Sequence, residues 1–304
     1  MYFGFLNINK PGGCTSHDVV QLLRRSLAIE KIGHSGTLDP FATGVLVIGI
    51  NEATKLFEYL PQDKIYLAEI TFGIETDTND ITGNILASKE SIPPLHDLVK
   101  VVDTFKGKIK QKPPIFSSVK IRGERAYNLA RENKMTLENM PEKEVEVYSI
   151  EILSCDVIEA CHGMSLQLKI HCSGGTYIRS IARDLGYMLG TYATLSNLKR
   201  TKVGDYFNLE NSVSPDLLNK DVLSRYLLPA KDILPFEKLY LDDNQRNDIA
   251  CGKSITISSN TINQKFQMID NKGNLIGIGC LTSENILKPI KVFIKREESQ
   301  LCVK

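Results

Sequence analysis

Several short patterns in this sequence have the residue types of catalytic or phosphate-binding motifs. Gly33–Thr37 (GHSGT) approaches the nucleophile elbow GxSxG, but threonine replaces its second glycine and the segment precedes a loop, not a helix. Gly44–Gly49 has the glycine spacing of a phosphate-binding loop, but Ile50 and Asn51 follow it where lysine and serine or threonine are required. Asp80–Gly83 matches only the weak pattern DxxG. A serine hydrolase is therefore poorly supported, and so is a nucleotide hydrolase.

The histidines and cysteines form no metal-binding pattern. None of the five histidines belongs to an HExxH motif, and the seven cysteines contain no CxxC pair. Scattered thiols are typical of a reducing cytosol, where they behave as small apolar side chains. We therefore expect a cytoplasmic protein with no metal site and no redox dithiol.

One carboxylate, Asp39, lies in a glycine-punctuated loop within Lys31–Gly49, which reads KIGHSGTLDPFATGVLVIG. An Asp-Pro pair by itself most often begins a turn, because the aspartate side chain accepts hydrogen bonds from the backbone that follows. Its meaning therefore depends on the rest of the chain.

Hydrophobic periodicity predicts the elements that would position this loop. A helix is expected over His17–Ala28, with Thr15 or Ser16 as its N-cap, and another over Thr176–Leu189. Alternation predicts strands at Tyr66–Phe72 and Met164–Cys172. The remaining predictions are a polar loop at 31–39, a buried strand at 44–50, a helix at 52–60, strands at 265–269, 275–281 and 288–295, and a hairpin turn at 270–274.

The composition is that of a soluble globular protein of two domains. The chain has 304 residues, of which 42% are hydrophobic and 24% charged, and its formal net charge is +1. No apolar run is long enough to cross a bilayer, and the N-terminus does not resemble a secretion signal. Prolines bracket 229–235, so we expect one domain at 1–232 and a small β-rich domain at 233–304.

A nucleic-acid partner would have to be held by a local patch, and one such patch exists. The segment from 100 to 134 holds ten lysines and arginines against three acidic residues, with Phe105, Phe116 and Tyr127 interspersed. Cations with interleaved aromatic rings suit a phosphate backbone and unstacked bases, although a solvated surface segment has the same composition.

Six segments in the same order resemble the tRNA pseudouridine-55 synthases of the TruB type. Lys31–Gly49 is similar to the family signature GHxGxLDPxAxGxL, which surrounds its catalytic aspartate. The other resemblances are Phe5–Ser16 (FLNINKPGGCTS), Tyr66 with Thr76–Gly83 (TDTNDITG), Pro113–Arg131 (PPIFSSVKIRGERAYNLAR), Cys172–Gly186 (CSGGTYIRSIARDLG) and Leu198–Gly204 (LKRTKVG).

This resemblance implies a fold, a reaction and a partner. The fold would be α+β, a mixed and mostly antiparallel sheet flanked by helices, with a small C-terminal PUA-like β-barrel that contacts the acceptor side of tRNA. The reaction would convert a uridine in the T-arm loop of tRNA into pseudouridine, with extrusion of the base and no cofactor. The enzyme would act as a monomer, without guide RNA and away from membranes, and 100–134 would be its basic RNA-binding insertion.

The resemblance also assigns roles to individual residues. Asp39 matches the catalytic aspartate, Arg179 the arginine that pairs with it, and Tyr66 the tyrosine that stacks on the uracil. His34, Tyr177 and Leu198 match substrate-binding residues, and Lys10, also assigned to substrate binding, is expected with Pro11 to support the Asp39 loop. Each of four residues has an ordinary structural alternative. For Arg179 it is a surface arginine paired with Asp184, and for Tyr66 a core tyrosine. For His34 it is a surface histidine, and for Lys10 a surface lysine.

Two other functions stay open on the sequence. The first is a tRNA-binding or tRNA-folding module in which isomerisation is secondary, which the set of Asp39, Tyr66 and Arg179 argues against. The second is the related guide-RNA-dependent class, which the chain length and the insertion at 106–131 disfavour.

Overall fold

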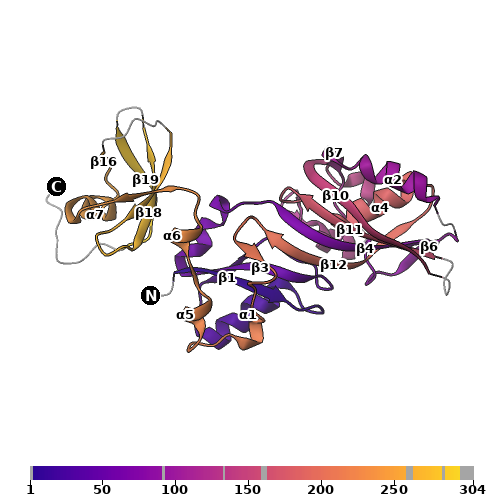
Figure 1. Cartoon of the computed structure of the whole chain (residues 1–304), viewed down its shortest axis with the longest axis horizontal. Coiled ribbons are helices and arrows are strands. Elements are labelled where there is room, and N and C mark those ends of the chain that lie inside the picture. The colour runs from indigo at the N-terminus through magenta and orange to yellow at the C-terminus, as the bar shows by residue number, and fades with distance from the viewer. Residues whose placement is uncertain are drawn as a thin grey trace.

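The computed structural model describes residues 3–90, 93–132, 134–158, 163–257, 263–282 and 285–294. Its largest element is a curled sheet of ten strands in which β14, β1, β3, β12, β4, β11, β10 and β7 follow one another, with β2 beside β3 and β13 beside β12 (Figure 1). The strands are β1 Gly4–Lys10, β2 Ile32–Ser35, β3 Thr43–Ile50, β4 Lys64–Phe72, β7 Gly107–Gln111, β10 Lys143–Ile158, β11 Gly163–Cys172, β12 Ala193–Val203, β13 Phe207–Asn208 and β14 Leu228–Pro229.

Among the described strands of this sheet, β3 and β12 form the one parallel pair. Gly44, which is paired with Arg200 in this contact, has a positive φ of 100°, and a Cβ at this position would overlap the carbonyl oxygen of Arg200. A glycine is therefore needed for the two backbones to approach. β12 then continues as the antiparallel partner of β4, so it joins the two halves of the sheet.

Helices cover the two halves separately. The helices are α1 Ser16–Leu27, α2 Leu95–Asp103, α3 Ala126–Arg131, α4 Ile178–Met188, α5 Leu223–Tyr226, α6 Ala230–Ile233 and α7 Asp243–Ala250, with 3₁₀ helices η1 Asn51–Tyr59, η2 Leu137–Asn139 and η4 Pro215–Leu217. α1 buries Val19, Leu23 and Leu27 against β1 and β3, and Thr15 caps it in a capping box with Asp18. α4 packs Ile181 and Leu185 against the other half, together with α2.

The second sheet has five strands in the order β15, β17, β18, β19, β16, and its first pair is parallel. The strands are β15 Glu237–Tyr240, β16 Ile255–Thr256, β17 Lys265–Ile269, β18 Leu275–Leu281 and β19 Ile286–Val292. The α+β fold class, with a mostly antiparallel sheet and a curled, PUA-like C-terminal sheet, is confirmed. The expected boundary at 232/233 falls within α6, between the last strand of the large sheet and β15.

The two sheets share an apolar cluster. Phe5 and Tyr59 of the large domain belong to the same group of buried side chains as Ile269 and Ile278 of the small sheet. Lys265 and Lys291 place their ammonium groups 5.0 and 5.1 Å from the centre of the Tyr59 ring, within range of a cation–π contact. Lys291 also donates to Glu58 and to the carbonyl of Lys55.

Two strand glycines in the small sheet serve packing. A Cβ at Gly277 would overlap the carbonyl oxygen of Lys291, and one at Gly279 would lie 2.9 Å from Leu287. The pairing of β18 with β19 also shifts register between Ile278 and Gly279. These glycines therefore accommodate a bulge and the neighbouring side chains. Lys295, the last residue of the strand expected at 288–295, lies outside the described residues.

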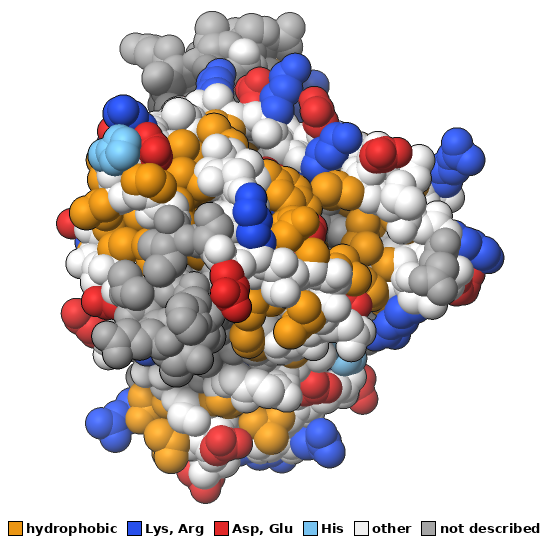
Figure 2. Space-filling model, turned by 90° about the vertical axis from the view of Figure 1, so that its right-hand side faces the viewer, with side chains coloured by type: hydrophobic (Ala, Val, Ile, Leu, Met, Phe, Trp, Pro, Cys, Tyr) orange, Lys and Arg blue, Asp and Glu red, His pale blue; other side chains and the backbone are white. Residues whose placement is uncertain are grey.

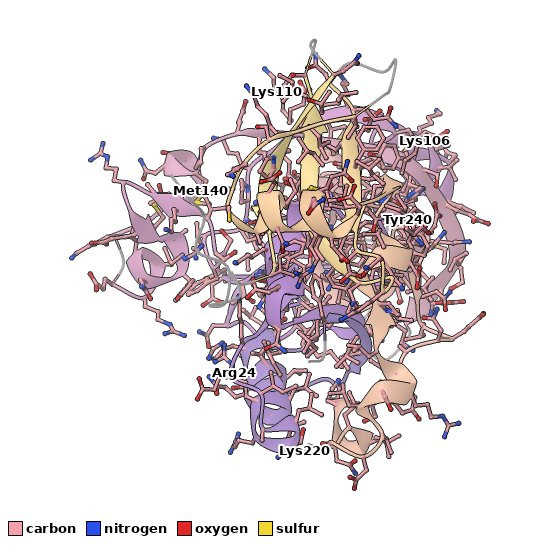
Figure 3. The ribbon with its side chains drawn as sticks, turned by 90° about the vertical axis from the view of Figure 1, so that its left-hand side faces the viewer. Arg24, Lys106, Lys110, Met140, Lys220 and Tyr240 are labelled. Atoms are coloured by element: carbon pink, nitrogen blue, oxygen red, sulfur yellow. The ribbon has the colours of Figure 1, made fainter. Side chains whose placement is uncertain are left out.

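The basic segment folds into several short elements. It contains the end of α2, all of β7, a hairpin of β8 Lys120–Ile121 with β9 Glu124–Arg125, and α3. The part near Met140 stands out from the side of the molecule (Figure 3). A second hairpin, β5 Ile74–Thr76 with β6 Ile85–Ser88, lies beside β12.

The end of the molecule formed by α2, β6 and the end of α4 carries exposed hydrophobic side chains, with acidic and basic side chains interspersed (Figure 2). They include Ile85, Leu86, Leu95, Val99, Tyr187 and Met188. No described helix is both long and apolar enough to cross a membrane.

Three predicted elements differ from the structure in type or by more than two residues at one end. Part of the loop expected at 31–39 forms β2, which pairs with the edge of β3 despite its polar residues. The helix expected at 52–60 is the 3₁₀ helix η1, which follows Ile50 in an extended conformation. The strand expected at 288–295 begins two residues earlier, at Ile286, and ends at Val292.

Candidate active site

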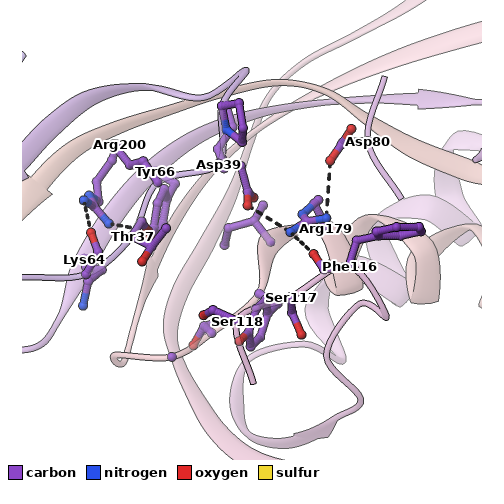
Figure 4. A pocket seen from close by; sticks show the side chains of 18 of the residues that line it. Thr37, Asp39, Lys64, Tyr66, Asp80, Phe116, Ser117, Ser118, Arg179 and Arg200 are labelled. Carbon is purple, nitrogen blue, oxygen red and sulfur yellow. Dashed lines mark hydrogen bonds and ion pairs between the residues drawn. The ribbon is translucent and has the colours of Figure 1, made fainter. Parts of the chain in front are cut away.

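A pocket of about 940 Å³ opens where β12 joins the two halves of the sheet. Its wall includes four of the residues predicted for the site in addition to Asp39, namely Tyr66, Tyr177, Arg179 and Leu198. They come from β4, from the start of α4 and from β12, so segments distant in the sequence meet here (Figure 4). Five of the seven predicted site residues thus line one cavity.

Asp39 is paired with Arg179 inside this pocket. Nη2 of Arg179 donates to Oδ1 of Asp39 at 2.9 Å, and the arginine side chain is 6% exposed whereas that of the aspartate is 31% exposed. The carboxylate is therefore open to a ligand on one side and neutralised on the other. The alternative of a surface arginine paired with Asp184 is wrong, because Asp184 pairs with Arg183 at 2.8 Å.

Arg179 is held by three further oxygens. Nη1 donates to the carbonyl of Thr78 at 2.8 Å and lies 3.4 Å from Oδ2 of Asp80, and Nη2 also donates to the carbonyl of Phe116 at 3.1 Å. Asp80 is buried and accepts from Thr82 N at 3.0 Å and Thr78 Oγ1 at 2.8 Å. The guanidinium is thus fixed between two carboxylates, as a planar fork can be and a point charge cannot.

The Asp39 loop is anchored by two buried cations that approach it from opposite ends. Lys10 donates to the carbonyls of Pro11, Cys14 and Pro40 at 2.8, 2.7 and 3.2 Å. Arg200 donates to the carbonyls of Gly36 at 2.9 Å and Val45 at 2.7 Å. Both side chains are completely buried. Each cation is bound by oxygen dipoles and adds positive potential near the carboxylate.

These contacts decide between the roles that the sequence left to Lys10. Lys10 is fully buried and therefore not a surface lysine. It does not line the pocket, so the structure does not support a contact between Lys10 and the substrate. Its hydrogen bond to Pro40 instead makes it a support for the residue that follows Asp39.

Tyr66 lies on the apolar face of β4, with 6% of its surface exposed. Burial raises the pKa of its hydroxyl, and the positive charge of Arg200 acts in the opposite direction. The phenol is therefore protonated at neutral pH, and its hydroxyl lies beside a fixed cation. Burial likewise raises the pKa of Tyr177, whose backbone N–H donates to Gln111 Oε1 at 2.8 Å.

His34 is not among the residues that line this pocket. It lies half-buried on β2, opposite Ile48 of β3. Burial lowers the pKa of its imidazole, with smaller effects from Arg200 and His17. Its role at the extruded nucleotides stays a prediction.

Three buried charged residues that line the pocket were not assigned a role by the sequence analysis: Asp80, Arg200 and Lys64. Asp80 and Arg200 lie inside motifs that carried the family resemblance. Within the described residues, no group of three or more metal-ligating side chains is close enough to hold a metal ion.

The architecture matches known structures at low sequence identity. The crystal structure of a Cbf5-Nop10-Gar1 complex superposes with a TM-score of 0.67 at 24% identity, over 97% of this chain and 86% of that one. A box H/ACA sRNP Nop10-Cbf5 complex from an archaeon gives 0.65 at 23%, over 97% of this chain and 87% of that one. These likenesses concern the fold alone.

Family models and close relatives are more specific. Residues 24–178 match the TruB family pseudouridylate synthase N-terminal domain, 179–237 the tRNA pseudouridylate synthase B C-terminal domain, and 238–293 the pseudouridine synthase II TruB C-terminal domain. The chain belongs to the TruB family of pseudouridylate synthases. It is therefore an isomerase that forms pseudouridine.

Two relatives illustrate the similarity, and both bear the name tRNA pseudouridine synthase B. The protein of Clostridium kluyveri is 37% identical over 96% of this chain and 99% of its own length. That of Borreliella burgdorferi is 43% identical over 84% of this chain and 88% of its own length.

Proposed function

We propose that this protein converts the uridine at position 55, in the T-arm loop of tRNA, into pseudouridine, and that Asp39 is its catalytic residue. The observation that carries the proposal is the half-buried Asp39 carboxylate, ion-paired with Arg179 in a pocket that also contains Tyr66. The relatives named tRNA pseudouridine synthase B support tRNA as the substrate, and the sequence motifs support position 55.

The reaction needs a carboxylate beside the ribose. The N1–C1′ bond breaks, the uracil turns, a C5–C1′ bond forms, and the proton on C5 is lost while N1 gains one. Asp39 acts either by attack on C1′ or by removal of a proton from C2′, and a carboxylate suits both routes. Arg179 is the cation that stays paired with this carboxylate when the bound nucleotide displaces water.

Tyr66 and its neighbours account for the handling of the base. The Tyr66 ring provides an apolar face for the uracil, and Leu198 and Tyr177 line the same cavity. The volume of about 940 Å³ exceeds what one base fills, so extruded nucleotides fit with part of their backbone. Extrusion costs roughly a few kcal/mol, which contacts in the pocket must offset.

The basic insertion supplies contacts to the RNA backbone. Arg131 lies 5.7 Å from the centre of the Tyr127 ring, and both residues line the pocket. Lys106 and Lys134 are paired with acidic neighbours, but no carboxylate lies within ion-pair distance of Lys110 or Lys120 in the described structure. We further propose that 233–304 forms a separate domain that contacts the acceptor side, and that the enzyme acts as a cytoplasmic monomer without a cofactor or guide RNA.

The direct test incubates the purified protein with an unmodified tRNA transcript and no additions. Pseudouridine is then tagged with a reagent that adds mass and located by mass mapping. We expect a single modified site at position 55, and none in a transcript with cytidine there. A transcript bound but left unmodified would favour the tRNA-folding alternative.

Replacing Tyr66 by phenylalanine separates stacking from hydroxyl chemistry. The ring is kept, so tRNA affinity should change little. Loss of the hydroxyl, which lies near the Arg200 cation, should slow release of the C5 proton about 10²-fold. Tritium release from tRNA labelled at C5 measures this step. Full activity of Tyr66→Phe would exclude the hydroxyl from the reaction.

A further inference from the structure

Two buried cations in the pocket wall lack an acidic partner. Lys64 is 7% exposed and Arg200 is fully buried, and neither has a carboxylate within ion-pair distance in the described part of the chain. Nζ of Lys64 donates to the carbonyl of Gln62 at 2.6 Å, and the guanidinium of Arg200 likewise meets only carbonyl oxygens. Buried charges in proteins are normally paired, because an uncompensated ion loses its hydration.

The pocket wall as a whole has an excess of positive charge. Its cations are Lys64, Arg131, Lys143, Arg179 and Arg200, and its anions are Asp39 and Asp80, so five minus two leaves +3. Both carboxylates lie against Arg179. Figure 4 shows Arg179 and Asp80 on one side of Asp39, and Lys64 and Arg200 on the other. Part of the uncompensated positive charge therefore lies on the side of the pocket away from Arg179.

A glycine pair leaves this side of the pocket uncovered. Gly174 and Gly175 line the pocket beside Lys64 and Lys143. A Cβ at Gly174 would lie 3.4 Å from Nζ of Lys64, and one at Gly175 would overlap the Lys143 ammonium. Because these two positions carry no side chain, both ammonium groups are accessible to a ligand entering from the pocket.

We propose that Lys64 and Lys143 form a subsite that binds one backbone phosphate adjacent to the target nucleotide. The inference rests on the proposed function, because it takes RNA as the substrate. A phosphodiester carries one negative charge, is present on either side of every nucleotide and accepts hydrogen bonds from ammonium groups. Arg200 contributes potential from behind while it stays bound to the Asp39 loop.

The protonation of Lys64 supports this assignment. Burial and then the positive charge of Arg200 lower its pKa to about 8. The groups that face it are Arg200 on β12, Cys172 on β11, Asp63 before β4 and Lys143 on β10. A bound phosphate favours the charged ammonium and raises this pKa again. RNA affinity should therefore be constant below about pH 8 and should fall as the pH rises above it.

The test measures binding of T-arm stem-loops in which one phosphate at a time is replaced by an uncharged methylphosphonate. All proteins carry Asp39→Asn, so that bound RNA is not converted. The variants are Lys64→Met, Lys64→Arg and Lys143→Gln. The control is Lys220→Gln, which changes an exposed lysine at the bottom of the molecule in Figure 3. Lys143 is exposed, so its variant reports binding even if Lys64→Met folds poorly.

On unmodified RNA, we expect Lys64→Met and Lys143→Gln each to weaken binding about 10-fold. Each should also reduce the slope of log Kd against log salt by about 0.7 to 0.9. Lys64→Arg should keep the affinity for RNA, and that affinity should no longer decrease above pH 8. Lys220→Gln should change neither the affinity nor its dependence on salt. One methylphosphonate should replace the phosphate that this subsite binds. With that RNA, Lys64→Met and Lys143→Gln should cause no further loss of affinity.

Three results would overturn the phosphate subsite. One is that Lys64→Met and Lys143→Gln lower RNA affinity equally at every methylphosphonate position. The second is competition by inorganic phosphate with no position-specific effect. The third is a slower single turnover of Lys64→Met, with Asp39 intact and RNA saturating, at unchanged Kd, which would place the cation at the reacting base. The function itself is tested separately, by whether the unaltered enzyme forms pseudouridine in tRNA.

Discussion

Asp39→Asn should abolish pseudouridine formation while the protein still binds tRNA. Asparagine has the size of aspartate and keeps an oxygen for the hydrogen bond that Arg179 donates at 2.9 Å, so the pocket should keep its shape. A neutral amide is neither a nucleophile for C1′ nor a base for C2′. We expect the single-turnover rate to fall at least about 10⁴-fold, in the range found when nucleophiles are removed from other enzymes. The Kd for tRNA should stay within a few-fold.

A matched control removes a different carboxylate. Asp205 pairs with Lys202 at the surface, and its side chain is 88% exposed. Asp205→Asn should therefore turn over like the unaltered enzyme. If Asp39→Asn kept a rate close to that of this control, the assignment of the catalytic residue would be wrong.

Arg179→Lys should reduce kcat about 10²- to 10³-fold. The guanidinium contacts Asp39, Asp80 and the carbonyls of Thr78 and Phe116, and one ammonium group cannot reach all four. Buried acceptors left without a donor, together with a carboxylate that is no longer held in place, cost about 3–4 kcal/mol. The measurement is single-turnover pseudouridine formation at saturating tRNA.

The neighbouring helical turn provides the control for this variant. Arg183 is equally buried on α4 but pairs with Asp184 and does not line the pocket. Arg183→Lys should disturb helix packing as much while leaving the rate within a few-fold. Circular dichroism melts of both variants would separate unfolding from lost chemistry. A near-normal kcat/KM for Arg179→Lys would contradict a role for its planar fork.

The sequence predicted the strands around the site well, because their apolar alternation is strong. Tyr66–Phe72 lies within β4, and Met164–Cys172 fills all but one residue of β11. It missed β2, since the polar residues of this strand lack that alternation and its pairing depends on β3. It also took η1 for an ordinary helix, because apolar spacing over nine residues does not distinguish a 3₁₀ helix.

Within the site, the resemblance indicated the residues that we propose to react, and the structure identified those that hold them. The contact between Asp80 and Arg179 joins positions 99 residues apart in the sequence, and no local pattern predicts it. Burial of Lys10 and Arg200 was equally hidden, because cationic residues are usually exposed and both are enclosed only by distant segments.

The apolar cluster that contains Phe5, Tyr59 and Ile278 limits how the role of the C-terminal sheet can be examined. Truncation after Pro235 would remove Phe236, which packs against Tyr59, and Phe293, which packs edge-on against Phe3. The apolar side chains of the remaining part would then be exposed to water. Aggregation of such a fragment would then be mistaken for a loss of RNA recognition. Charge reversal at exposed positions such as Lys288 keeps the junction intact and gives the cleaner comparison.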